Sequence, residues 1–149
     1  MRIEDEIKQK KFRSEFEKLA VNLLYTHGWL INKHSQFLEP FGITLNQYNI
    51  LRILRGQHPN PASINLLKER MLDKMSDASR LVERLRVKGL IDRKICENDR
   101  RKAEVFITEK GLETLAKLDN AASEIDNILG RLEEKEAEIL NDLLDRLRS

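Results

Sequence analysis

The most constraining feature of the sequence is a change of hydrophobic period near residue 89. Between residues 74 and 88, apolar positions recur every three or four residues, as on one face of an amphipathic helix: Ala78, Leu81, Val82 and Leu85. After Gly89 the pattern alternates through residues 91–95, as in a strand. A second alternating run at 103–108 follows a polar turn at 97–102. The chain therefore predicts a helix that leads directly into a two-stranded hairpin.

Gly89 also predicts where that helix ends. Glycine readily adopts the left-handed backbone conformation that follows many helices. Leu90 can then fold back onto Leu85. We therefore expect the helix to stop at Lys88, directly before the first strand.

Apolar residues at helical spacing predict further helices on both sides of this unit. Pro40 and Gly42 end the first of them, Ser63 can cap the third, and Thr108 can cap the helix after the hairpin. The expected helices span residues 7–38, 45–55, 64–71 and 74–88 before the hairpin, and 109–132 and 137–147 after it. The predicted fold class is mainly α with a small β-hairpin.

Charge is distributed unevenly along the chain. The net charge is +3 over residues 1–59, +4 over 60–110 and −5 over 111–149, which gives the overall +2. A basic middle and an acidic end make a polarised molecule, of which one end suits a polyanion. Solvated helix faces with a chance asymmetry give the same pattern, so charge alone leaves both interpretations open.

Several classes of site are disfavoured by the residues present. A single cysteine, Cys96, excludes an internal disulfide and a cysteine metal cluster, and His27 and His34 have no clear carboxylate partner for a metal. We find no Ser/His/Asp grouping, glycine-rich phosphate loop or paired carboxylates, so we expect no cofactor and no enzyme. No apolar run approaches about 18 residues, and the amino terminus is charged, so we expect a cytoplasmic protein without a membrane partner.

Three helices followed by a hairpin form a winged helix-turn-helix, in which a helix enters the major groove of DNA and the hairpin reaches over the backbone. At about 100° per residue, the polar face of the helix at 74–88 lies opposite its apolar face. Serine fits close to base edges, and arginine can bond guanine with two hydrogen bonds. An amphipathic surface helix explains the same periodicity. The polar positions are Ser76, Arg80 and Glu83, with Ser79 beside them and Arg84 and Arg86 at the flanks.

The predicted hairpin turn carries three cations in a row, in the sequence Asp99-Arg100-Arg101-Lys102. Arginine at such a tip can enter a narrow minor groove, where the negative potential is enhanced. Asp99 can hold the guanidinium of Arg101 and reduce the entropy lost on binding. A solvated turn is the alternative interpretation, although it is less common directly after a helix-turn-helix.

The stretch Ser63–Gly111 resembles the multiple-antibiotic-resistance regulator (MarR) family. The resemblance is carried by SRLVERLRVKGLIDRKICENDRRKAEVFITEKG, with its basic helix end, G-L-I-x-R strand start, D-x-R wing and T-E-K-G helix start. The long helices on both sides resemble that family's dimerisation platform. The resemblance implies one domain over 1–149, with a DNA-binding lobe at 44–110 and dimerisation helices at 1–40 and 111–149.

The resemblance also implies roles for individual residues. Ser76, Asp77, Ser79 and Arg80 take recognition-helix positions, and Asp99 and Arg101 take the wing pair. The helical phase and the charge of the hairpin tip add four further expected DNA contacts, Arg84, Arg86, Arg100 and Lys102. Two residues depart from the family pattern. Leu72 stands where members often have glycine, and Asp77 is an acid where a small neutral residue is usual. Asp77 can accept from a cytosine amine or cap the helix.

The resemblance further implies a cavity for small aromatic or anionic compounds where the platform meets the DNA-binding lobe. Trp29 and Tyr48 are the candidates to line it, and both are equally plausible as ordinary core. Cys96 lies at the base of the wing, whereas the family's oxidant-sensing cysteines lie near the start of the first helix. We therefore interpret Cys96 as a bystander.

The expected function is sequence-specific binding of double-stranded DNA, by a homodimer that represses transcription from a palindromic operator and is released by a small-molecule effector. The alternative is a helical protein–protein adaptor whose winged domain no longer binds DNA. Support for that alternative comes from Glu83, Asp77 and the acidic carboxyl-terminal region. Salt dependence separates the two, because a phosphate-contacting dimer loses affinity steeply with salt.

Overall fold

The computed structural model describes residues 1–99 and 102–149, so the expectations for Arg100 and Arg101 lie outside the described residues. In chain order the elements are α1 (Ile3–Glu6), α2 (Glu15–Leu38), η1 (Glu39–Phe41), α3 (Leu45–Gln57), β1 (Ala62–Ser63), α4 (Ile64–Arg70), α5 (Ala78–Val87), β2 (Ile91–Cys96), β3 (Asp99–Ile107), α6 (Glu109–Asn120), α7 (Ala122–Leu129) and α8 (Glu134–Arg148).

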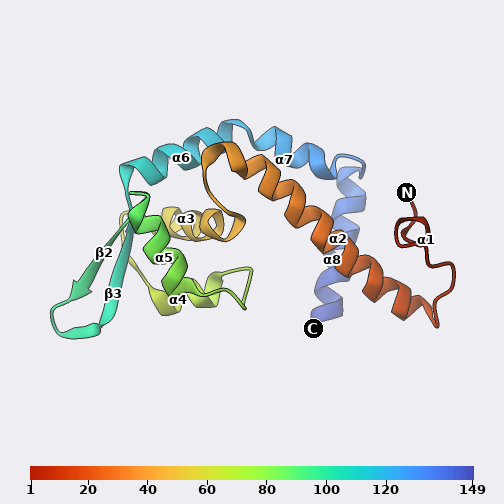
Figure 1. Ribbon diagram of the computed structural model, residues 1–149, viewed down its shortest axis with the longest axis horizontal. Coiled ribbons are helices and arrows are strands. Elements are labelled where there is room, and N and C mark those ends of the chain that lie inside the picture. Colours follow the sequence, from red (N-terminus) through yellow and green to blue (C-terminus); the bar gives the residue numbers. More distant parts are fainter.

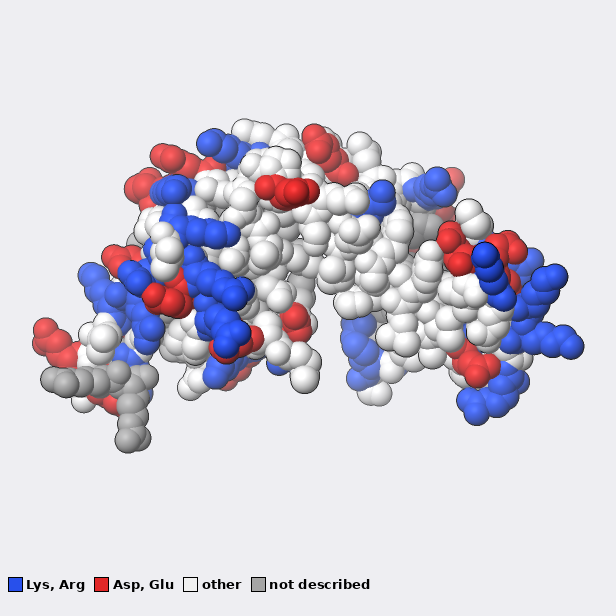
Figure 2. All heavy atoms as spheres, viewed as in Figure 1, with Lys and Arg blue, Asp and Glu red and all other residues white. Residues whose placement is uncertain are grey.

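The molecule is an arch. A lobe built on α3, α4, α5 and the sheet stands at one end, and α1, α8 and the start of α2 stand at the other (Figure 1). The space between the two ends is open (Figure 2). No helix in the described ranges is long and apolar enough to cross a membrane.

The helix boundaries follow from short-range hydrogen bonds. At the start of five helices, a side-chain oxygen accepts a hydrogen bond from the backbone amide three residues later. The residues that supply this oxygen are Ser14, Thr44, Ser63, Asp77 and Thr108. The predicted caps at Ser63 and Thr108 are confirmed. At the end of α5, Gly89 has φ +74°, and the Leu90 amide donates to the Leu85 carbonyl at 3.1 Å. The predicted helix stop is confirmed as well.

Two predicted helix starts were wrong. The helix predicted from residue 7 begins at Glu15, because Ser14 is extended and caps α2, while the polar run before it has no apolar face to pack. The short helix α1 precedes the predicted span and was not expected. The helix predicted from residue 74 begins at Ala78, since Asp77 caps it and the preceding residues form a loop around Asp73. The region after the hairpin contains three helices and not two, because the backbone at Ala121 leaves the helical conformation.

The hairpin belongs to a three-stranded antiparallel sheet of order β1-β3-β2. The turn between β2 and β3 comprises Glu97 and Asn98, so the prediction of a turn over 97–102 was wrong. Backbone pairing begins at Asp99, opposite Cys96. On a hairpin that projects into solvent, both faces tolerate polar side chains, and the alternation that marks a half-buried strand is lost.

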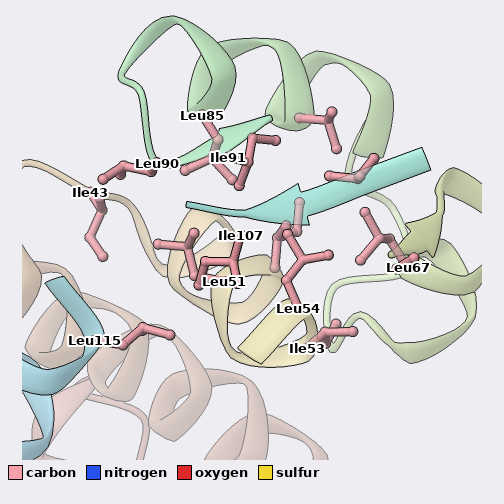
Figure 3. Close-up of a cluster of buried hydrophobic side chains, with 14 of the residues drawn as sticks. Ile43, Leu51, Ile53, Leu54, Leu67, Leu85, Leu90, Ile91, Ile107 and Leu115 are labelled. Carbon is pink, nitrogen blue, oxygen red and sulfur yellow. The ribbon is translucent and has the colours of Figure 1, made fainter. Parts of the chain in front are cut away.

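One hydrophobic core joins the lobe to the platform, the name used below for α1, α2, α6, α7 and α8 (Figure 3). Leu51 and Leu54 of α3 are almost fully buried, among side chains from α4, α5 and the sheet. Leu38 at the end of α2 and Leu115 of α6 are fully buried in the same cluster. The inner ends of the platform helices are therefore packed into the lobe, and the lobe cannot rotate against them without opening this core.

The surroundings of Gly111 show how closely α6 packs against the hairpin. A Cβ atom at this buried position would lie 2.3 Å from the Leu90 carbonyl oxygen and 2.7 Å from Cγ1 of Ile107. We expect Gly111→Ala to destabilise the fold by about 1–3 kcal/mol, because backbone must move to make room. Differential scanning calorimetry should report a Tm lowered by roughly 2–4 °C for each kcal/mol.

The matched control is Gly56→Ala in α3, because a Cβ atom added at Gly56 would have no heavy atom within 4 Å. That variant should keep or slightly raise the Tm. Equal Tm values for both variants would contradict the packing described.

Candidate nucleic-acid interface

The α5 helix buries one face and exposes the other. Ala78, Val82 and Leu85 are fully buried and Leu81 is half-buried, which confirms the predicted inner face. Lys and Arg side chains gather over α5 and the adjoining sheet (Figure 2). The outer face consists of exposed polar and charged side chains, namely Ser79, Arg80, Glu83, Arg84 and Arg86.

The first turn of α5 is organised by Asp77. Its carboxylate accepts the backbone amide of Arg80 at 3.1 Å, and its other oxygen lies 4.0 Å from the Arg80 guanidinium. Of the two roles open to Asp77 from the sequence, the helix cap is the one seen here. Ser76 was expected on the outer face of the helix, but it precedes the helix, and its hydroxyl donates to the Asp73 carbonyl at 2.7 Å.

Further along the same face, Glu83 holds Arg86. The guanidinium donates two hydrogen bonds to the carboxylate, from Nε at 3.0 Å and from Nη2 at 2.6 Å. The bond from Arg86, followed by the charges of Arg86 and Arg93, keeps the pKa of Glu83 below its ordinary value. Arg84 forms no ion pair within the described ranges. Arg80 and Arg86 thus each lie beside an acidic residue of the same lobe, and the Arg84 guanidinium is available to a phosphate.

The β2–β3 hairpin extends beside α5 and ends at Glu97 and Asn98. Lys94 lies over the ring of Phe106, with its Nζ 5.3 Å from the centroid, which orients one cation on the hairpin. Lys102 is exposed and Asp99 half-buried, both at the start of β3 and not in the turn where they were expected. Cys96 is half-buried at the end of β2.

The two residues expected to line one effector cavity lie in different surroundings. Trp29 lines a groove of about 860 Å³ between the amino-terminal residues, α2 and α7, together with Tyr25, Lys33 and Arg131. Tyr48 is half-buried on α3 against the core, and its hydroxyl accepts from Arg52. Tyr48 does not line the groove that contains Trp29. They are 19 positions apart in the chain and belong to helices that diverge.

A second, smaller groove of about 470 Å³ lies where α2 meets the lobe, lined by Ser35, Glu39 and Thr44 among others. It occupies the place where the cavity was expected. Most of its lining residues have polar side chains, but the surface that they turn toward the groove is mainly apolar. Among the described residues, no three His, Cys, Asp or Glu side chains come together in a way that could hold a metal ion. His27 is exposed, and burial lowers the pKa of the half-buried His34.

Comparison with known proteins identifies a family that shares these features. A model of the MarR family matches residues 41–102, which contain α3, α4, α5 and most of the hairpin. The HTH-type transcriptional regulator MhqR of Bacillus subtilis is 28% identical over 118 residues, which cover 78% of each chain. The chain belongs to the MarR family.

Solved structures of MarR-family proteins share the fold. A variant of E. coli MarR in complex with operator DNA has a TM-score of 0.78 at 21% identity, over 93% of this chain and 99% of that one. Bordetella bronchiseptica BpsR, whose DNA binding is regulated by 6-hydroxynicotinic acid, has a TM-score of 0.77 at 21% identity. The match covers 89% of this chain and 100% of BpsR. The predicted family and fold class are confirmed.

MarR-family proteins are transcriptional regulators that bind DNA, and they are not enzymes. In the winged-helix arrangement, α5 corresponds to the recognition helix and the β2–β3 hairpin to the wing. In winged-helix proteins the corresponding helix and hairpin form the surface that meets DNA.

Lys88 is a residue of this MarR fold that sequence reasoning missed. Its ammonium donates to the Gly42 carbonyl at 2.5 Å and to Oε1 of Gln47 at 2.9 Å, which ties the end of α5 to the junction of α2 and α3. Gln47 is buried, and it also closes the capping box of α3 with Thr44. A lysine in the last turn of a helix is an ordinary signal of a favourable helix dipole. Only the packing of α5 against α3 reveals its partners.

Proposed function

We propose that this chain represses transcription as a homodimer that binds a palindromic operator in the cytoplasm and leaves it when a small aromatic or anionic effector binds. The observation that carries the proposal is the exposed cationic face of α5 beside a cationic wing. In a winged helix, the recognition helix reads base edges and the wing contacts the backbone or the minor groove.

The geometry supports a division of labour along α5. Ser79 and Arg80 lie in its first turn, at the end that reaches base edges, and we assign sequence reading to them. Arg84 and Arg86 lie in the last turn, and we assign phosphate contacts to both. On the wing we assign Arg101 to the minor groove, with Asp99 as its orienting partner, and Arg100 and Lys102 to the backbone.

The adaptor alternative loses its main support. Asp77 and Glu83 are the acids on the recognition face that favoured a protein partner. Asp77 caps α5, and Glu83 orients Arg86, so both acids have a role inside the lobe. Neither needs an external cation to explain its presence.

Two wing variants test the DNA interface. Arg101→Ala should weaken binding to a duplex selected from a random pool by about 1–3 kcal/mol per half-site, and more than Arg100→Ala does. The control is Lys117→Ala on α6, an exposed cation of the platform that should bind like the wild type. Fluorescence anisotropy over a range of salt concentrations provides the affinities, and the wild-type slope should be steep. Wild-type affinity in both wing variants would remove the wing from the interface. A wild-type protein with no duplex affinity at low salt would favour the adaptor.

The second half of the proposal, the homodimer, rests on an uncovered apolar face. No residue of α8 is buried, and four large apolar side chains on one side of it are 43–57% exposed: Ile139, Leu140, Leu143 and Leu147. The opposite side carries Glu138, Asp142 and Asp145. Phe16 and Leu24 of α2 are also largely exposed. An exposed apolar helix face of this kind marks an association site, and a second copy of the same helices supplies a matching face.

Changing this face should separate the subunits. The variant Leu140→Gln/Leu143→Gln should sediment as a monomer or aggregate at micromolar concentration, because each leucine buried at an interface contributes roughly 1.5–3 kcal/mol. The control, Glu138→Gln/Asp142→Asn, changes the polar side of the same helix and should remain dimeric. Sedimentation velocity distinguishes the outcomes. A soluble wild-type monomer at high concentration would contradict the symmetric model.

For effector release we propose the groove that contains Trp29. An indole and a phenol, Trp29 and Tyr25, line it, and both can stack against an aromatic ring. Its charged lining residues are the cations Lys33 and Arg131 and the acids Glu6 and Glu124, and the two cations can bind the charge of a small aromatic anion. BpsR, a structural neighbour, is regulated by such a compound. Tyr48 lies away from this groove and is left out of the proposal.

The effector proposal predicts reciprocal coupling between ligand and operator. An aromatic acid found by thermal-shift screening should raise the Tm of the free protein and lower operator affinity by about 1–3 kcal/mol. Trp29→Ala should lose both effects, whereas Tyr48→Phe should retain them. Titration of operator with and without the acid measures the coupling. Tight binding of the acid with unchanged operator affinity would make the groove a packing or storage site.

A further inference from the structure

The loop between α4 and α5 exposes two large apolar side chains at the start of the recognition helix. Leu72 is 82% exposed and Met75 is 94% exposed. A single exposed apolar residue is ordinary on a protein surface. Two of them on one short loop beside the base-reading end of a DNA-binding helix raise the question of what they contact.

The loop is held in place by Asp73. One carboxylate oxygen accepts the backbone amide of Met75 at 3.0 Å, and the other accepts the side-chain amide of Asn46 at 3.1 Å. The Asp73 carbonyl accepts the Ser76 hydroxyl at 2.7 Å. These bonds join the loop to α3 and to the start of α5.

Both ends of the loop are anchored as well. The backbone amide of Leu72 donates to Oδ1 of Asn49 on α3 at 2.9 Å, and the preceding Met71 is buried in the core. The Lys74 ammonium turns back to the carbonyls of Lys68 and Glu69 at the end of α4. Leu72 and Met75 are therefore exposed on a loop with a defined backbone, so little backbone entropy is lost when they make a contact.

The position of Met75 determines which partner it can reach. It lies two residues before Asp77, the cap of α5, at the end of the recognition helix that approaches base edges. The loop lies beside that end of α5, on the concave side of the arch (Figure 1). Its neighbours Lys74 and Arg80 are cations, and Ser79 is a small polar residue, which suits DNA better than an apolar protein surface.

The major groove offers one apolar group to such a side chain, the 5-methyl group of thymine. We propose that Met75 determines specificity by packing against thymine methyl groups in each half-site, with Leu72 covering the contact from the loop side. The polar residues of α5 would recognise the hydrogen-bonding groups of the bases, and Met75 would recognise the methyl groups of neighbouring thymines. The inference rests on the proposed function, since it requires operator binding.

The test replaces thymine by uracil, which pairs identically and lacks only the methyl group. A duplex selected from a random pool with the wild-type dimer is synthesised with single thymine-to-uracil changes, then with symmetric pairs of changes. At one symmetric pair, wild-type affinity should fall about fourfold for each methyl group, the effect expected for burying one carbon of this size, and about 15-fold for the pair. Anisotropy at constant salt measures each affinity.

Met75→Ala should bind the thymine duplex as weakly as the wild type binds the uracil duplex, and it should not distinguish the two. Met75→Leu should restore the difference. Val87→Ala removes a 72% exposed apolar side chain from the opposite end of α5 and should leave the difference intact. All variants should keep the wild-type Tm and sedimentation coefficient, because Met75 is exposed.

The results distinguish this inference from the proposed function. A wild type that binds its selected duplex without any thymine–uracil difference overturns the methyl contact and leaves operator binding intact. The same holds if Met75→Ala retains the difference. A change of oligomeric state in Met75→Ala assigns the loop to a protein contact and also overturns the inference. Failure to select any duplex overturns the proposed function and the inference together.

Discussion

The end of α5 is the junction on which the rest of the structure depends. Gly89 adopts a left-handed conformation that an L side chain disfavours, and this lets Leu90 turn back onto Leu85 and enter the sheet. The Gly89 carbonyl accepts the Thr108 hydroxyl, and the Thr108 amide donates to the Leu90 carbonyl. One turn of chain thus sets the end of the recognition helix, the start of the wing and the start of α6. None of the three can move without the others.

Hydrogen bonds from lysine side chains and core packing connect the same junction to the platform. Lys88 bonds to the carbonyl of Gly42 between α2 and α3, and Lys110 of α6 donates to the Lys88 carbonyl. Leu38 and Leu115 bring the inner ends of α2 and α6 into the core of the lobe. In a dimer, the separation of two recognition helices would follow from the packing of the platform, because a close-packed core transmits displacement and does not absorb it.

Local features of the sequence predicted most of this lobe. The inner face of α5, the caps at Ser63 and Thr108 and the stop at Gly89 all depend on interactions within a few residues, so periodicity and residue type were sufficient to find them. The start of α5 was predicted too early because the loop around Asp73 makes its own hydrogen bonds, which compete with the helix. The roles of Asp77 and Glu83 on the recognition face likewise became clear only from their hydrogen bonds.

The sequence by itself determined the order of helices and strands, the amphipathic faces and the family resemblance, because these follow from the chemistry of neighbouring residues. Tertiary structure decided which distant residues meet. The short strand β1 exists only because Ala62 pairs with Val105, and Lys88 acquires its role only beside Gly42. Trp29 lines a groove that Tyr48 does not line, because α2 and α3 diverge. The contacts of Ala62 with Val105 and of Lys88 with Gly42 each close a loop of more than 40 residues, and no local pattern records which of many possible closures the packing of the core selects.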